Sequence, residues 1–247
     1  MHRFFAPSLD SGDAFVTLPR DEAEHLTRVL RLGVGETVAV FDGRGREFLG
    51  KVQAASRRDV QVQILSPIAP AREWGVHVTL VQAVLKGDRM DDVVRDGVML
   101  GVAAIQPIVT KRTETTIAQI LRGARDDRWR RIALASAKQC RRAVVPEIQI
   151  PLPFASYLVE PAPELRLMLV EPSAESAAPV ARLSVLRGQR VPMSVALLVG
   201  PEGGWDREEV AAAASSGITL VSLGDRTLRA DATPIAALSI LDFLWEI

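Results

Sequence analysis

Beyond residue 75, short apolar segments alternate with segments of helical pattern, and this alternation constrains the fold more than any other feature of the chain. The apolar segments resemble strands that are buried on both faces of a sheet. Strands alternating with helices predict an α/β domain whose mainly parallel sheet is covered on both faces. The predicted strands are 76–84, 103–109, 165–171, 193–200 and 218–224, and the predicted helices are 88–100, 113–123, 126–141, 206–216 and 233–247.

The first 70 residues have a different pattern. Segments 37–41, 46–53 and 59–65 read as strands, and Gly43 and Gly45 mark the turn between the first two. Short strands spaced in this way predict a small β-barrel or sandwich. A helix over 21–31 interrupts them and puts His25, Arg28 and Arg31 on one stripe. The sequence therefore predicts two domains, 1–70 and 74–247, with a proline-containing linker between them.

Composition narrows the function classes. The single cysteine, Cys140, excludes an internal disulfide framework and fits a reducing compartment. The N-terminal stretch has no apolar signal segment, and no apolar run reaches the roughly 20 residues of a membrane span. We therefore expect a cytoplasmic protein without a membrane partner. Residues 107–146 carry ten basic and three acidic residues, which fits either a solvated face or contact with a polyanion.

The segment Gly200-Pro201-Glu202-Gly203-Gly204 lies where a predicted strand passes into a predicted helix. Ligands of open α/β sheets bind at the carboxyl ends of strands, and glycines let the backbone approach a ligand closely. Asp206 and Glu209 have the spacing of a capping pair, which is a structural role. Glu202 precedes the helix and is not needed as its cap, so it is a candidate functional carboxylate.

Two other predicted strands end in polar residues. Segment 223–234 carries Arg229 and Asp231 before the last helix. Glu171 is the last residue of the strand predicted at 165–171, and Pro172 follows it. Asp231 has two interpretations, a helix cap or part of a site. Arg229 is either a surface group or a functional cation.

The sequence lacks the motifs of several common kinds of enzyme chemistry. The three histidines, His2, His25 and His77, are scattered, so no metal site is predicted. No Gly-x-Ser-x-Gly elbow and no Walker loop is present. Segment 33–38 imitates half of a dinucleotide fingerprint, but it lies between a helix and a strand, which is the wrong context.

Taken together, the motifs resemble those of the ribosomal RNA small subunit methyltransferase E family of the SPOUT superfamily, nearly from end to end. The segments that carry the resemblance are HLTRVLRLGVGETVAVFDGRG, KGDRMDDVVRDGVMLGV, KQCRRAVVP, LLVGPEGGWDREE and LGDRTLRADATPIA. The resemblance implies methylation of N3 of a uridine in 16S rRNA with S-adenosylmethionine and without a metal. The sequence departs from the family at Asp231 and Ala232, where Glu and Thr are usual. It also departs at Lys138 and Cys140, where Glu and Ser are frequent.

The family implies a PUA-like RNA-binding β-barrel followed by a SPOUT domain with a trefoil knot, working as a homodimer. For the reaction that the resemblance implies, our hypothesis is that Arg229 would stabilise the uracil anion or position a phosphate, and that Glu202 would orient the base or move its proton. The implied cofactor residues are Leu198, Val199, Gly200, Pro201, Gly203, Gly204, Leu223, Gly224, Leu228 and Ala230, and the implied RNA-binding residues are Arg3, His25, Arg28, Arg31, Lys86, Arg89, Arg112 and Arg142.

Two alternatives remain open on the sequence alone. One is a non-catalytic RNA-binding or ribosome assembly factor that keeps the fold, since LRADAT departs from the usual motif. The other is a SPOUT methyltransferase that acts on another RNA.

Overall fold

The computed structural model describes residues 1–56, 59–172 and 178–246, so Ile247, the last residue of the predicted closing helix, lies outside the described part. The chain divides into two compact units, residues 1–73 with 137–145 and residues 74–136 with 146–247. Residues 137–145 were not expected in the first unit. Two basic side chains account for them. The Lys138 ammonium contacts both carboxylate oxygens of Glu22 at 2.7 and 2.8 Å, and Arg3 donates to the carbonyls of Ala137 and Lys138.

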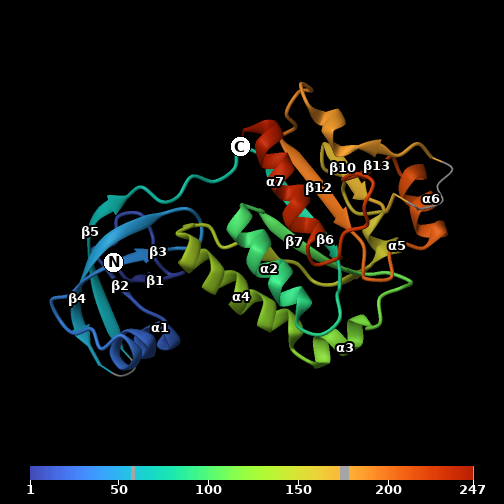
Figure 1. Ribbon diagram of the computed structural model, residues 1–247. Coiled ribbons are helices and arrows are strands. Elements are labelled where there is room, and N and C mark those ends of the chain that lie inside the picture. Colours follow the sequence, from blue (N-terminus) through green and yellow to red (C-terminus); the bar gives the residue numbers. More distant parts are fainter. Residues whose placement is uncertain (57–58, 173–177, 247) are drawn as a thin grey trace. The chain divides into compact units, whose positions relative to one another are not determined.

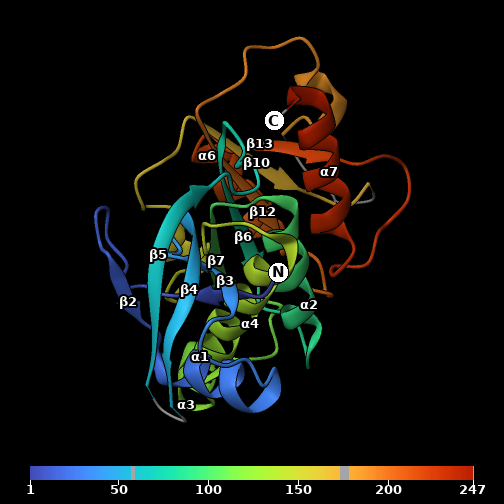
Figure 2. The same ribbon diagram turned by 90° about the vertical axis from the view of Figure 1, so that its left-hand side faces the viewer.

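The first unit is built on one five-stranded sheet in the order β1-β3-β4-β5-β2. The long antiparallel pair of β4 and β5 can be followed in Figure 2. Side chains from the strands and the helical segment, Phe4, Leu26, Val38 and Val62 among them, form its buried core. The elements are β1 (Arg3–Phe5), β2 (Phe15–Thr17), α1 (Arg20–Glu24), η1 (His25–Val29), β3 (Thr37–Phe41), β4 (Glu47–Ala55) and β5 (Val60–Ile68).

The helix predicted over 21–31 is helical through Val29, but its second half is not an α-helix. The α-helix ends at Glu24 and continues as a π-helical turn, in which the Leu30 amide donates to the His25 carbonyl at 3.0 Å. Arg31 lies beyond the turn with φ of 56°. The wider π turn rotates each residue by less than an α turn does. The predicted stripe of His25, Arg28 and Arg31 therefore does not form.

The second unit is built on a parallel sheet in the order β11-β13-β10-β12-β6-β7-β8, with β9 also paired to β7. All of its strand pairs are parallel, as the sequence predicts. Its strands are β6 (His77–Ala83), β7 (Ala104–Val109), β8 (Glu147–Ile148), β9 (Leu152–Pro153), β10 (Leu165–Leu169), β11 (Ala181–Arg182), β12 (Ser194–Val199) and β13 (Thr219–Ser222). Its helices are α2 (Arg89–Leu100), α3 (Ile117–Arg122), α5 (Phe154–Tyr157), η2 (Leu183–Leu186), α6 (Arg207–Ser215) and α7 (Thr233–Trp245), and α4 (Arg125–Cys140) ends in the first unit.

Helices cover both faces of this sheet. On one face, alternate strand residues such as Met168 and Leu198 pack against Phe154 of α5 and Val210 of α6. On the other face, Gly97 of α2 lies so close to Leu80 that an added Cβ would be 3.5 Å from that side chain. Helix α7 packs against α2, and Figure 1 shows the two side by side over the sheet. The predicted α/β architecture is therefore confirmed.

The strand order determines which loops meet. Strands β13, β10 and β12 are neighbours and point the same way, so the loops that follow them lie together at one edge. Strand β6 pairs with the other side of β12, which adds the loop between β6 and α2. The strand order therefore brings together the three segments that the sequence analysis identified as polar ends of strands.

Candidate active site

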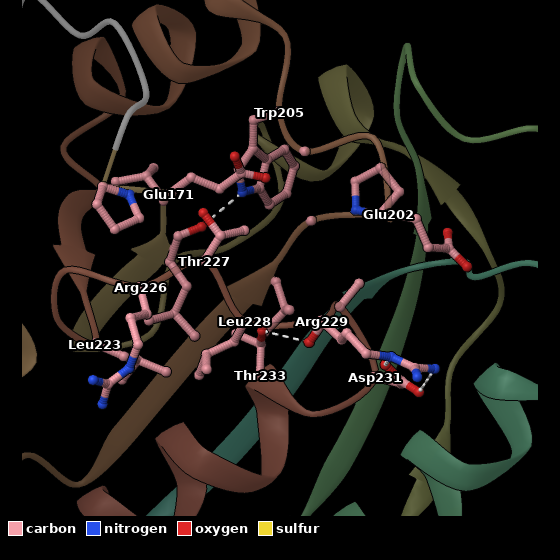
Figure 3. A pocket seen from close by; sticks show the side chains of 18 of the residues that line it. Glu171, Glu202, Trp205, Leu223, Arg226, Thr227, Leu228, Arg229, Asp231 and Thr233 are labelled. Atoms are coloured by element: carbon pink, nitrogen blue, oxygen red, sulfur yellow. Dashed lines mark hydrogen bonds and ion pairs between the residues drawn. The ribbon is translucent and has the colours of Figure 1, made fainter.

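A cavity of about 420 Å³ lies at the carboxyl ends of β10, β12 and β13. Figure 3 shows Leu228 and Thr233 near its centre, with Glu171 and Arg229 on opposite sides of them. Ligand sites typically have volumes of about 300 to 1,000 Å³, so this cavity has room for a small organic ligand. Its walls are formed by Arg89, Leu169, Val170, Glu171, Pro172, Val199, Gly200, Pro201, Glu202, Gly204, Trp205, Leu223, Arg226, Thr227, Leu228, Arg229, Ala230, Asp231 and Thr233.

The glycine segment after β12 is held by Trp205. The Trp205 indole N–H donates to the Leu169 carbonyl at 2.8 Å, and its ring contacts Phe154. A Cβ at Gly200 would be 3.0 Å from the indole nitrogen, and one at Gly204 would be 2.9 Å from Oε1 of Glu171. Gly204 also has φ of +68°, which side chains disfavour. Close packing against Trp205 favours glycine at position 200, and the backbone conformation favours it at position 204.

Helix α6 begins with the predicted capping pair. The Asp206 carboxylate accepts from the Glu208 amide at 3.0 Å, and Glu209 accepts from the Asp206 amide at 3.0 Å. The other oxygen of Glu209 accepts from the Lys111 amide at 2.8 Å, and Arg112 donates to the Gly203 carbonyl at 2.9 Å. The structural role of Asp206 and Glu209 is confirmed. These contacts also attach the glycine segment to the loop after β7.

Glu202 is already engaged by other parts of the second unit. Its Oε1 accepts from the Lys86 amide at 3.0 Å and from Nη1 of Arg89 at 3.1 Å. Figure 3 shows its carboxylate directed away from Leu228, although the residue lines the cavity. In this state, Glu202 joins the glycine segment to the loop between β6 and α2.

Arg229 and Asp231 form an ion pair at the rim of the cavity, with Nε–Oδ1 and Nη2–Oδ2 distances of 3.1 and 2.9 Å. Burial alone would raise the pKa of the Asp231 carboxyl, but the Arg229 hydrogen bond and nearby positive charge hold that pKa below its usual value. The helix-cap interpretation of Asp231 is wrong, because Ala232 is the cap residue of α7 and no side chain caps it. The Thr233 hydroxyl donates instead to the Arg229 carbonyl at 2.8 Å.

Most of the residues expected to hold a cofactor come together in this cavity. Leu198 is fully buried in the core, Gly203 lies against Arg112, and Gly224 lies outside the lining. Sequence reasoning missed Trp205, although its position directly after the glycines was a usable signal, and it gave no role to Arg226 or Thr227. The expected residues that do line the cavity are Val199, Gly200, Pro201, Gly204, Leu223, Leu228 and Ala230.

The residues expected to bind RNA divide between the two units. The half-buried Arg3 pairs with Glu47 at 2.8 Å, and Arg142 is buried against Glu73. Both guanidinium groups are therefore engaged by carboxylates of the first unit, and the RNA-binding role expected for them stays a prediction. Burial of a charge requires such a partner, and the carboxylates that provide it lie 44 and 69 residues away along the chain.

The other residues that were expected to bind RNA are accessible to solvent. His25, Arg28 and Arg31 are exposed in the first unit. In the second unit, Lys86 pairs with Glu114, while Arg89 and Arg112 contact the glycine segment as described. Lys86, Arg89 and Arg112 thus surround the cavity loops.

Metal-binding clusters and membrane-spanning helices are both absent from the described residues. They contain no group of three or more His, Cys, Asp and Glu side chains that could hold a metal ion. Within the same ranges, no helix is both long and apolar enough to cross a bilayer.

The family of this chain follows from comparison with known proteins. Residues 72–242 match the RNA methyltransferase domain family, and residues 18–65 match the RNA methyltransferase PUA domain. A ribosomal RNA small subunit methyltransferase E from Synechocystis sp. is 33% identical over 95% of this chain and 75% of the relative. The chain belongs to the ribosomal RNA small subunit methyltransferase E family. The predicted family and the predicted class of enzyme, an RNA methyltransferase, are therefore confirmed.

Solved structures of methyltransferases agree with this membership. The ribosomal RNA small subunit methyltransferase E of Neisseria gonorrhoeae, bound to S-adenosylmethionine, aligns with a TM-score of 0.85 at 30% identity over 99% of this chain and 98% of that chain. A methyltransferase from Legionella pneumophila, also with bound S-adenosylmethionine, gives a TM-score of 0.84 at 30% identity, covering 98% and 96% of the two chains. The predicted methyl donor is thus the one bound by these structural neighbours.

Proposed function

We propose that this family member methylates N3 of a specific uridine in the 16S rRNA of the small ribosomal subunit, with S-adenosylmethionine as methyl donor. The observation that carries the proposal is the joining of the glycine segment and the 223–231 loop around one cavity in a chain of this family. Curated relatives named for the small subunit rRNA support the substrate.

The cavity residues fit the cofactor chemically. Leu223 and Leu228 supply apolar surface for an adenine ring, and Gly200 and Gly204, which have no side chain of their own, line the same cavity. Val199, Pro201 and Ala230 complete the proposed binding surface. Bound S-adenosylmethionine would supply an electrophilic methyl group on its sulfonium.

The chain itself must activate the uridine. N3 of uracil carries a proton and becomes a good nucleophile only when that proton leaves, so a cation near the developing anion would lower the barrier. Arg229 is the proposed cation, since its guanidinium lies at the cavity rim and 70% of its side chain is exposed. When substrate binds, the guanidinium of Arg229 would leave Asp231 and contact the uracil edge or a neighbouring phosphate.

Glu202 is proposed to orient the base or to accept the N3 proton. This role requires its carboxylate to leave Arg89 and turn toward the substrate. Arg89 would then be available to an RNA phosphate. The target base must also be presented outside any stack, because the cavity loops would otherwise not reach N3.

His25, Arg28 and Arg31 of the first unit are proposed to contact RNA. In the second unit, the proposed RNA contacts are Lys86, Arg89 and Arg112. The match of residues 18–65 to the PUA domain of RNA methyltransferases supports this assignment. Domain limits of 1–70 for RNA binding and 74–247 for methyl transfer are part of the proposal.

We further propose a trefoil knot in the second unit and a homodimer in the cytoplasm. Strand β13 lies between β10 and β11 although it is the last strand in sequence, which is compatible with a threaded C-terminus. Phe243 of α7 is 73% exposed and Met99 of α2 is 42% exposed, which supports an apolar seam between two subunits. Light scattering of the purified protein would give the mass of a dimer or of a monomer.

The test of the reaction is transfer of labelled methyl from S-adenosylmethionine to 30S subunits and to naked 16S rRNA, followed by nucleoside analysis. The proposal predicts 3-methyluridine as the labelled product. A different methylated nucleoside would overturn the N3 assignment. Cofactor binding without transfer to either RNA would favour another RNA or the non-catalytic alternative.

A further inference from the structure

The charged side chains that line the cavity differ in their contacts. Arg89 pairs with Glu202, and Arg229 pairs with Asp231. Over the ranges that the structure describes, the side chains of Glu171 and Arg226 make no hydrogen bond and no ion pair. Glu171 is therefore the lining carboxylate whose acceptor oxygens remain available to a ligand.

Glu171 lies between the end of β10 and the glycine segment. Trp205 is hydrogen-bonded to Leu169, two residues before Glu171, and Gly204 leaves the space that Oε1 of Glu171 occupies. In Figure 3 the Glu171 side chain extends toward Trp205. A Cβ at position 204 would lie 2.9 Å from this oxygen, so the absence of a side chain there leaves room for the carboxylate.

The location of Glu171 indicates which part of the cofactor it would meet. This step rests on the proposed function, in which the glycine segment holds the adenosine part and the reacting methyl group faces Arg229. Glu171 touches the glycine segment and lies across Leu228 from Arg229 (Figure 3). A carboxylate in this position faces the nucleoside rather than the reacting end.

We propose that Glu171 accepts hydrogen bonds from the vicinal hydroxyls of the cofactor ribose. An ionised carboxylate has two acceptor oxygens and no donor, which matches two neighbouring hydroxyl donors. Such bonds to a charged acceptor are stronger than neutral ones. Glu171 is thus a cofactor-binding residue that fixes the orientation of the nucleoside, and it does not take part in proton transfer.

The test uses titration calorimetry of the full chain with two probes. S-adenosylhomocysteine contains the ribose diol and the amino acid part, whereas 5′-methylthioadenosine keeps the adenosine with its diol and lacks the amino acid part. Loss of a hydrogen bond to a charged group corresponds to roughly a tenfold to hundredfold change in affinity. Glu171→Ala should weaken both probes by a similar factor in this range, and Glu171→Gln should weaken them less, because the amide oxygen still accepts one bond.

The 2′-deoxy form of S-adenosylhomocysteine provides the second arm. For this compound, the difference in affinity between the wild-type protein and Glu171→Ala should be smaller than for S-adenosylhomocysteine itself, because the partner hydroxyl is missing. Glu160→Gln, an exposed carboxylate outside the cavity lining, is the matched control and should bind both probes as the wild type does. Thermal denaturation of each variant would show that the fold is intact.

The contradicting results are distinct. If Glu171→Ala weakens S-adenosylhomocysteine but not 5′-methylthioadenosine, the carboxylate holds the amino group and the ribose assignment is wrong. Equal affinities of wild type and Glu171→Ala for both probes would also overturn it, while leaving the proposed function intact. Failure of the wild-type protein to bind either probe would contradict the proposed function itself.

Discussion

At the scale of single residues, the two departures in LRADAT have a structural explanation. Asp231 is shorter than the Glu of the family, yet both of its oxygens contact Arg229. The hydroxyl lost at Ala232 has a counterpart in Thr233, which donates to the Arg229 carbonyl. Arg229 is therefore held by its side chain and by its backbone. These contacts favour an intact site over the non-catalytic alternative.

Arg229→Ala should slow methyl transfer more than it weakens cofactor binding. Removal of a group that stabilises transition-state charge commonly costs a factor of about 10² to 10³ in turnover. The affinity for S-adenosylhomocysteine should stay close to that of the wild type, because the proposed adenosine contacts are made elsewhere. Single-turnover rates and calorimetry would separate the two effects. Wild-type turnover in this variant would remove Arg229 from the mechanism.

Glu202→Gln tests the proposed base or base-orienting group. The amide can still accept from the Lys86 amide but loses the charge that attracts Arg89. Turnover should fall by a factor of about 10² if the carboxylate accepts the N3 proton. If turnover is unchanged, Glu202 only connects the glycine segment to the loop after β6.

At the scale of elements, the sequence predicts the long strands and helices well, because their apolar periodicity repeats over several turns or pleats. The strand expected at 37–41 has these bounds in the structure, and the helix expected at 88–100 begins one residue later. Strands β8, β9 and β11 were missed because they have two residues each. The π turn was missed because its backbone widening leaves no composition signal.

The turn between β3 and β4 offers a stability prediction. The Asp42 carboxylate is fully buried and accepts from the Arg44 and Arg46 amides and from their side chains. Burial alone would raise its pKa, but these hydrogen bonds and the Arg46 charge leave that pKa below its usual value. Asp42→Asn keeps the size but not the charge, and should lower the free energy of unfolding by about 1–2 kcal/mol at pH 7.

The pH dependence of this effect follows from the sign of the shift. A carboxyl whose folded pKa is depressed contributes stability above its unfolded pKa of about 3.9, and this contribution is lost as the pH falls through the folded pKa. The difference between wild type and Asp42→Asn should therefore be constant near neutral pH and shrink below about pH 4. Denaturant unfolding at a series of pH values would measure it. A difference that grows on acidification would contradict the lowered pKa.

At the scale of the whole molecule, the two units are not two consecutive stretches of sequence. Residues 137–145 belong to the first unit, where Lys138 meets Glu22. Lys138 replaces a residue that is often Glu in the family, and the carboxylate at position 22 explains why a cation is suitable here. Sequence reasoning could not find this pairing, because the two residues lie 116 positions apart.

RNA binding by the first unit should depend on salt. Each arginine that contacts a phosphate adds about one unit to the slope of log affinity against log salt. Arg28→Ala combined with Arg31→Ala should weaken binding to 16S rRNA and reduce the slope by about 2, with S-adenosylhomocysteine affinity unchanged. Arg187→Ala, an exposed arginine of the second unit, serves as control. An unchanged slope in the double variant would exclude this surface from the RNA contact.

The central claim is that the loops after β10, β12 and β13 form the cofactor site. Hydrogen–deuterium exchange of the full chain with and without S-adenosylhomocysteine tests it most directly, because backbone amides of the loops themselves are observed. The account predicts protection concentrated in residues 199–205 and 223–231 when the ligand is bound. Binding that leaves both segments unprotected and protects another region would contradict it.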